Sequence, residues 1–248
     1  MSAGSGVNLG APKTPPRWLD SFMQIIFPER CLFCRAVLPS CEGRPVCCSC
    51  GTGFTPAGSI CPSCESLIPP GEGPCSCCPA LPYLQSLFAL SFYEGQWRFL
   101  LQNLKYHGRR SLARPLGRWL GLEISERHFC RPDLVVPVPL YRSREKERGF
   151  NQSSLIALYT ARVLEIQCLP VLFKTIDTAS QATLSRTERF ENIRSAFSSS
   201  TVFPPGTVIL LIDDIYSTGS TLKEAAKALH KSGAEVHAAV IAYNPLIK

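Results

Sequence analysis

The sequence predicts an α/β protein with a mainly parallel sheet flanked by helices, preceded by a small cysteine-rich module. From about residue 80 onward, short apolar runs alternate with segments of helical periodicity, as in domains built from strands and helices. One of these runs, at residues 208–212, is largely β-branched and ends in two carboxylates. Before residue 80, the chain instead repeats Cys-x-x-Cys pairs separated by Pro, Gly and Ser.

Length and composition are those of a protein with one ordinary core and a smaller attached module. The chain has 248 residues, of which 45% are hydrophobic. No apolar run approaches the roughly 20 residues of a membrane helix, so we expect no transmembrane segment. Residues 1–16 lack an apolar stretch of secretory type, which predicts a cytoplasmic protein. The net charge of +7 suits anionic ligands, and is consistent with either phosphates or nucleic acid.

Three regions are expected along the chain. Residues 1–16 contain three prolines and predict a disordered leader. Residues 17–79 predict a short amphipathic helix, ended by Pro28, followed by the cysteine-rich module. The polar face of that helix lacks a Lys/Arg cluster, which favours docking on the protein over anchoring at a membrane surface. Residues 80–248 predict the α/β domain.

The cysteine pairs predict two structural zinc sites. Thirteen cysteines in a chain without an export signal favour metal binding over disulfides. Zinc takes four ligands in a tetrahedron, so four pairs fill two sites, but the spacing does not say which pairs combine. Cys41, Cys48 and Cys77 are surplus, and Cys48 or Cys77 is an alternative to a neighbouring ligand. A thioredoxin-like redox role is the competing interpretation, although no βαβ pattern surrounds the pairs. The predicted zinc ligands are Cys31, Cys34, Cys47, Cys50, Cys61, Cys64, Cys75 and Cys78.

The α/β domain is expected to contain about five strands with helices between them. Apolar runs predict strands at residues 87–93, 134–140, 208–212 and 235–243. Helical periodicity is present at residues 96–106, 112–124 and 151–164, and again after residue 221. Asn151 is the expected cap of the third of these helices.

Two basic segments interrupt these elements. Residues 105–110 place three cations around Gly108, and two interpretations remain open: contact with a pyrophosphate, or a solvated helix end. The second segment follows a strand broken by prolines, so we expect a basic loop at the rim where α/β sheets bind ligands. Its cations are Arg142, Arg144, Lys146 and Arg148.

The acidic end of the strand at 208–212 leads into a candidate phosphate-binding loop. Asp213 and Asp214 close the strand, and a hydroxyl-rich loop precedes a helical pattern, which is how a phosphate is bound at a helix N-terminus. Thr221 and Glu224 have the spacing of a capping box. A nucleotide-hydrolase strand is the alternative, but the chain has no Gly-x-x-x-x-Gly-Lys-Ser/Thr loop. The loop residues are Ser217, Thr218, Gly219, Ser220 and Thr221.

This segment resembles the phosphoribosyl-pyrophosphate (PRPP) signature of the type I phosphoribosyltransferases. The resemblance implies that Asp213 and Asp214 contact the ribose and organise magnesium, and that residues 217–221 hold the 5′-phosphate. It also implies that the cations at 142–148 bind pyrophosphate. Several such transferases have an acid at the first loop position, whereas this chain has Ser217, so general-base chemistry from that position is in doubt.

The order of the motifs resembles the ComF/ComFC-like family, with its N-terminal double zinc ribbon. The resemblance rests on the cysteine pairs, Leu104-Lys105-Tyr106, residues 136–140, residues 148–152 and the PRPP signature. Residues 180–192 also look like the family's segment before the signature strand, although the basic residues usual just before Gln181 are missing.

The family resemblance implies two functions from different classes. The first is a magnesium-dependent phosphoribosyltransferase, an enzyme of the glycosyltransferase class in nucleotide metabolism, which moves ribose 5-phosphate to an unknown acceptor and releases pyrophosphate. The second is a non-catalytic protein of natural transformation (competence), which senses PRPP or a nucleotide, or binds single-stranded DNA or DNA-uptake proteins.

Overall fold

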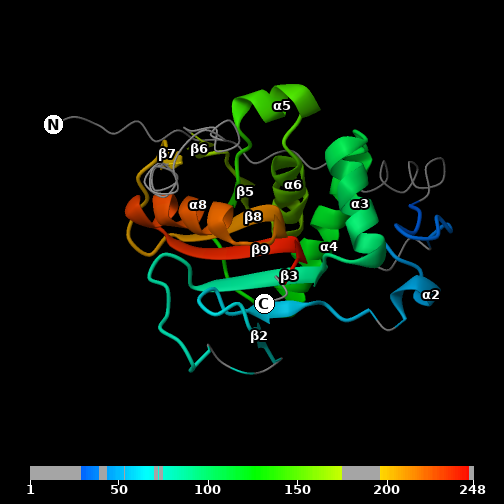
Figure 1. Ribbon diagram of the computed structural model, residues 1–248, viewed down its shortest axis with the longest axis horizontal. Coiled ribbons are helices and arrows are strands. Elements are labelled where there is room, and N and C mark those ends of the chain that lie inside the picture. Colours follow the sequence, from blue (N-terminus) through cyan, green and yellow to red (C-terminus); the bar gives the residue numbers. More distant parts are fainter. Residues whose placement is uncertain are drawn as a thin grey trace, which may run out of the picture.

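A seven-stranded sheet forms the centre of the protein in the computed structural model, which describes residues 29–38, 44–52, 54–69, 72, 75–174 and 196–245. The strand order is β2-β1-β3-β9-β8-β4-β5 (Figure 1). Its strands are β1 (Gly58–Ile60), β2 (Leu67–Ile68), β3 (Ser86–Phe92), β4 (Leu134–Pro137), β5 (Gln167–Cys168), β8 (Val208–Tyr216) and β9 (Glu235–Tyr243). A separate antiparallel pair joins β6 (Leu172–Lys174) to β7 (Phe197–Ser199).

Five neighbouring strands, β3-β9-β8-β4-β5, are parallel, which confirms the predicted fold class. The apolar run of β8 is buried on both faces, as is usual for a central parallel strand. Leu210 and Ile212 pack into the core on one face, while Ile209 and Leu211 pack into the core on the other. The run therefore holds β8 in the middle of the sheet and fixes where its acidic end emerges.

Helices cover both faces of the sheet. The core on one face includes α3 (Gly95–Tyr106), α4 (Ala113–Glu126) and α6 (Gln152–Leu164), and that on the other includes α8 (Ser220–Lys231) and the β6–β7 pair. Close contact between α4 and α6 requires Gly117, because a Cβ there would lie 2.5 Å from the main-chain oxygen of Ile156. The remaining helices of the described residues are the short α2 (Cys48–Gly51), the 3-10 helix Arg110–Leu112 and α5 (Arg142–Arg148), which projects away from the sheet (Figure 1).

The cysteine-rich segment packs directly on the α/β domain. Aromatic rings of its first half pack against the helices. The ring centroids of Phe33 and Trp97 are 5.5 Å apart, and those of Phe54 and Trp119 are 4.5 Å apart. Its second half contains the β1–β2 hairpin, and β1 pairs antiparallel with β3. The hairpin therefore extends the main sheet.

Of three local expectations, one is confirmed and two are wrong. The cap of α6 is confirmed, because the Asn151 side chain accepts hydrogen bonds from the amides of Ser153 and Ser154. The expected basic loop is wrong, because residues 142–148 form α5, which ends at Gly149 in the left-handed region (φ 74°). This segment consists mainly of Arg, Glu and Lys, which are strong helix formers. The capping box is also wrong, because α8 begins after Gly219 and Glu224 pairs with Lys227 instead.

Some expectations concern residues outside the described ranges. The leader, the amphipathic helix before Pro28 and the segment at 180–192 are among them. Within the described part of the chain, no helix has the length and apolar character needed to cross a membrane.

Candidate functional site

The acidic pair lies at the carboxyl end of β8, among side chains from two helices. Asp213 Oδ1 accepts hydrogen bonds from Ser153 Oγ (2.8 Å) and from the amide of Asp214 (2.9 Å). Asp214 is 4% exposed, and its Oδ2 lies 3.1 Å from Lys105 Nζ. That contact is an ion pair without hydrogen-bond alignment, and within the described residues Oδ2 accepts no hydrogen bond. The pair thus presents a buried acceptor that is not fully satisfied.

The electrostatics of the pair favour a bound cation. Burial, and then the negative charge of Asp214, raise the pKa of Asp213 from 3.8 to about 7. Hydrogen bonds from Ser153 and from the amide of Asp214, and the charge of Lys105, act in the opposite direction without cancelling the rise. A nearby divalent cation would stabilise both charged carboxylates. The oxygen donors suit magnesium, which prefers carboxylates, phosphates and water.

The loop after β8 is a tight turn that opens onto the N-terminus of α8. Gly219 is buried in the left-handed region (φ 69°), and a Cβ there would lie 2.2 Å from the hydroxyl oxygen of Tyr216. Lys223 makes the first helical hydrogen bond, from its amide to the oxygen of Gly219 (2.8 Å). The amides of Thr221 and Leu222 precede that bond, so they point out of the helix end.

The hydroxyl groups of the loop lie beside this helix end. Thr218 and Ser220 are exposed, and their Oγ atoms are 2.9 Å apart. Ser217 is half-buried and Thr221 is exposed. The predicted loop residues thus form one surface of hydroxyls and amides, which is chemically suited to a phosphate.

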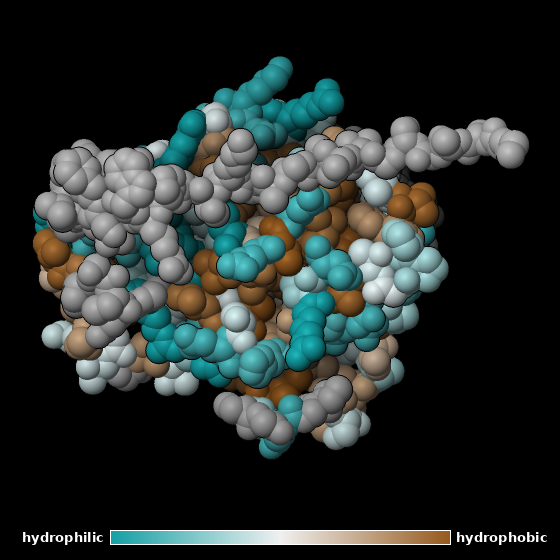
Figure 2. Space-filling model, turned by 180° about the vertical axis from the view of Figure 1, so that it is seen from behind, coloured by the Kyte–Doolittle hydropathy of each residue, from teal (hydrophilic) through white to brown (hydrophobic). Residues whose placement is uncertain are grey.

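The predicted cations lie on α5, and only the last is held by neighbouring side chains that the structure identifies. Arg142, Arg144 and Lys146 are exposed, and this hydrophilic projection forms the upper edge of the molecule in Figure 2. Arg148 donates to Gln152 Oε1 (3.2 Å), and its guanidinium lies 5.1 Å from the centroid of the Tyr106 ring. Arg148 is thus held where α5 leads into α6, the helix whose Ser153 supports Asp213.

The other basic segment meets this same region. Arg110 donates to the main-chain oxygen of Gly149 (2.8 Å), and its guanidinium lies 4.8 Å from the Phe150 ring centroid. Lys105 lies on the same segment and pairs with Asp214. Residues 105–110 therefore contact both the acidic pair, through Lys105, and the turn after α5, through Arg110.

Two residues of the site, Ser153 and Glu65, are not predicted by the sequence. Ser153 supports Asp213 from the start of α6, but a serine at that position is also common without any such role. Glu65 comes from the cysteine-rich segment, and its Oε1 accepts hydrogen bonds from Tyr216 Oη (3.0 Å) and Lys223 Nζ (3.1 Å). No pattern in the sequence signals that contact, because 151 residues separate Glu65 from Tyr216.

The eight predicted zinc ligands form two groups of four, in which the sulfurs lie within 4.8 Å of one another. We name them the first tetrad (Cys31, Cys34, Cys47, Cys50) and the second tetrad (Cys61, Cys64, Cys75, Cys78). Four thiolates in such a group fit tetrahedral zinc. Hydrogen bonds to Ser66 lower the pKa of Cys64 to about 6, whereas a hydrogen bond with Cys61, followed by burial, raises the pKa of Cys78 to about 12. Cys48 and Cys77 are exposed and belong to neither tetrad.

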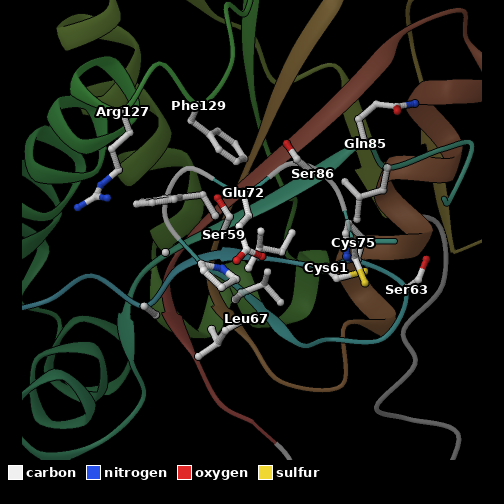
Figure 3. Close-up of a pocket in the computed structure, with 18 of the residues that line it drawn as sticks. Ser59, Cys61, Ser63, Leu67, Glu72, Cys75, Gln85, Ser86, Arg127 and Phe129 are labelled. Carbon is white, nitrogen blue, oxygen red and sulfur yellow. The ribbon is translucent and has the colours of Figure 1, made fainter. Parts of the chain in front are cut away.

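A cavity of about 930 Å³ lies beside the second tetrad, apart from the acidic pair. Figure 3 shows Arg127 and Phe129 on one side of it, and Cys61 and Cys75 on the other. The β1–β2 hairpin forms another part of its wall. Neither the acidic pair nor the loop at 217–221 is among the described residues that line it.

Comparison with known proteins agrees with this arrangement. The family model of the phosphoribosyl transferase domain matches residues 160–246. Competence protein F of Haemophilus influenzae is 31% identical, over 86% of this chain and 96% of that protein. The DNA utilization protein YhgH of Escherichia coli K12 is also 31% identical, over 84% of this chain and 93% of that protein. Competence protein ComFC of Bacillus subtilis is 29% identical, over 57% of this chain and 56% of that protein.

The similarity to the first two relatives spans most of this chain and nearly their full length. The matched domain contains β8, the acidic pair and the following loop. With its type I phosphoribosyltransferase-like fold and its N-terminal cysteine tetrads, the chain belongs to the ComF/ComFC-like family.

Proposed function

We propose that this protein binds PRPP together with magnesium and transfers its ribose 5-phosphate unit to an acceptor, releasing pyrophosphate. One observation carries the proposal: the acidic pair at the end of β8 runs directly into the Gly219 turn and the open N-terminus of α8. This arrangement sets oxygen donors for a ribose and a metal beside amides and hydroxyls for a phosphate.

The loop at 217–221 holds the 5′-phosphate in this proposal. The amides at the start of α8 and the hydroxyls of Thr218 and Ser220 donate to the phosphate oxygens, and the helix dipole favours the negative charge. Gly219 lets the main chain turn tightly over Tyr216, where any other residue would collide with the ring.

In this proposal the acidic pair binds the ribose and magnesium, and a cation binds the pyrophosphate. Asp213 and Asp214 accept the ribose hydroxyls and hold the magnesium ion, which supplies positive charge beside the diphosphate when it is bound. Gln152 and Tyr106 hold Arg148 at the end of α5, and in this proposal its charge stabilises the departing pyrophosphate. Ser217 is not a base, so the acceptor is one that reacts without proton removal from that position.

A second candidate function is the binding of single-stranded DNA. The exposed cations Arg142, Arg144 and Lys146 on the projecting α5 favour it, because phosphate backbones are bound chiefly by such charges. The names of the relatives, competence protein and DNA utilization protein, favour the same function. DNA-uptake proteins are the alternative partners of this surface.

A pair of matched glycine variants tests PRPP binding at the loop. Gly219→Ala and Gly206→Ala both place a side chain at positive φ, but only Gly219 meets the Tyr216 ring, whereas Gly206 has open space around its position. Calorimetric titration with PRPP and magnesium should show saturable binding in the wild type and in Gly206→Ala, and none in Gly219→Ala. Equal PRPP affinities in the two variants would show that the loop is not the phosphate site.

A further inference from the structure

Glu65 occupies a turn that belongs to the second tetrad. The Glu65 amide donates to the oxygen of Cys61 (2.8 Å), and the Cys61 amide donates to the oxygen of Ser66 (2.9 Å). Glu65 itself lies in the left-handed region (φ 63°), which is unfavourable for a residue with a side chain. The same turn therefore fixes two sulfurs of the tetrad and the direction of Glu65.

The first tetrad contains the same turn without such a contact. The amide of Arg35 donates to the oxygen of Cys31 (3.1 Å), and Arg35 also lies in the left-handed region (φ 66°). Arg35 is exposed, whereas the side chain of Glu65 is only 18% exposed. The turn alone thus does not bury the side chain that follows the second cysteine. What distinguishes Glu65 is its contacts.

Those contacts tie Glu65 to three elements around the loop at 217–221. The carboxylate accepts hydrogen bonds from Tyr216 at the end of β8 and from Lys223 in the first turn of α8. Its main-chain oxygen accepts a hydrogen bond from Tyr243 Oη (2.9 Å), at the end of β9. Tyr216 and Tyr243 are paired in register, and their ring centroids lie 6.0 Å apart. Glu65 is therefore held at both its side chain and its main chain.

The partners of Glu65 in turn support the loop. Tyr216 is 1% exposed, and its hydroxyl lies directly beneath Gly219. Lys223 carries the amide that donates to the Gly219 oxygen, so the residue after the turn is also bound to Glu65. Burial, and then the charge of Glu65, raise the pKa of Tyr216, which keeps the phenol protonated as a donor. Both ends of the loop are thus fixed to one carboxylate.

We propose that Glu65 couples the second tetrad to the loop at 217–221, so that a metal ion bound by the tetrad holds the loop in its ligand-binding form. What the loop binds rests on the proposed function, but the coupling itself does not. A filled tetrad fixes the turn, the turn fixes Glu65, and Glu65 fixes Tyr216 and Lys223 around Gly219. Because coupling is reciprocal, a ligand on the loop raises the metal affinity of the second tetrad more than that of the first.

Hydrogen exchange of the full-length, zinc-loaded protein without PRPP measures the coupling directly. Within residues 217–223, we expect the hydrogen-bonded amide of Lys223 to exchange about tenfold faster or more in Glu65→Ala, the factor that corresponds to one lost charge-assisted hydrogen bond. Glu65→Gln keeps an acceptor oxygen and should show a smaller rise. The matched control is Glu165→Ala, which removes an exposed glutamate from another left-handed position (φ 57°) and should leave the loop unchanged.

Two further variants separate the coupling from damage to the metal site. Tyr216→Phe removes only the hydroxyl and leaves the tetrad intact, so zinc content should stay unchanged while exchange of the loop rises. Cys64→Ser should lower zinc content and raise exchange at 217–223, whereas Cys34→Ser, which breaks the first tetrad, should lower zinc content without that rise.

The outcomes are decisive in both directions. If the loop exchanged hydrogen at the wild-type rate in both Glu65→Ala and Tyr216→Phe, with both tetrads filled with zinc, the coupling would be overturned. Equal effects of Cys34→Ser and Cys64→Ser on the loop would also overturn it. Since no step uses PRPP, a protein that fails to bind PRPP can still show the coupling, and a PRPP-binding protein can fail to show it.

Discussion

Replacing Asp213 with asparagine should stabilise the free protein at alkaline pH. The side chain keeps its shape, and its oxygen can still accept hydrogen bonds from Ser153 and from the amide of Asp214. What disappears is a half-buried negative charge beside a second carboxylate. The natural residue is thus expected to lower stability in exchange for a function at this position.

The size and sign of the effect follow from the raised pKa of Asp213. The pKa is about 7 in the folded protein and close to 3.8 when the chain is unfolded. Between roughly pH 4 and 7 the folded state retains a proton that the unfolded state has lost, so stability falls as pH rises through this window and levels off above it. A shift of about three units corresponds to about 4 kcal/mol at 1.36 kcal/mol per unit. Because the residue is partly exposed, we expect about 2–4 kcal/mol.

Urea unfolding at pH 8 and pH 5, with zinc present, measures this difference. Asp213→Asn should exceed the wild type in free energy of unfolding by about 2–4 kcal/mol at pH 8, and by less than half of that at pH 5. Asp133→Asn is the matched control, because Asp133 Oδ2 accepts a hydrogen bond from the Val208 amide at the opposite end of β8. That variant should gain nothing at pH 8. Equal free energies of unfolding for the wild type and Asp213→Asn at pH 8 would show that folding does not raise the pKa of Asp213.

Three further predictions concern the cations and the tetrads. Lys105→Met should lower the free energy of unfolding by about 3 kcal/mol, because it leaves the buried Asp214 charge without its partner, and adding Asp214→Asn should recover most of the loss in urea unfolding. A full loss in the double variant would contradict the pairing. Elemental analysis should find about two zinc ions per chain, and Cys64→Ser should contain one; fewer than one in the wild type would exclude two sites. If α5 binds single-stranded DNA, replacing Arg142, Arg144 and Lys146 with glutamine should flatten the salt dependence of DNA affinity. An unchanged slope would exclude α5 as the DNA surface.

The parallel sheet and the acidic end of β8 were predictable because they depend on local patterns. A continuous β-branched run indicates a strand buried on both faces, and the residues that follow it must emerge at the sheet edge. The Asn151 cap depends on a contact only two residues away, which a sequence also reveals. The helical state of α5 had a local signal as well, in its run of helix formers, but the prolines before it favoured a loop.

The contacts of the cysteine-rich segment were not predictable in this way. β1 and β3 lie on either side of the second tetrad in the sequence, and a three-residue strand such as Gly58–Ile60 carries too little periodicity to be recognised. Glu65 has the composition of any surface residue, and its partners lie more than 150 positions away. Which cysteine pairs combine is likewise a matter of three-dimensional arrangement.

The magnesium dependence of PRPP affinity is the most direct test of whether the acidic pair binds PRPP together with magnesium. We would titrate PRPP calorimetrically into the zinc-loaded wild type and into the double variant Asp213→Asn, Asp214→Asn, each with and without magnesium. We expect the wild type to bind PRPP more tightly with magnesium, on the order of tenfold or more, and the double variant to bind weakly with no response to magnesium. Failure of the wild type to bind PRPP under either condition, or an unchanged magnesium response in the double variant, would contradict this expectation.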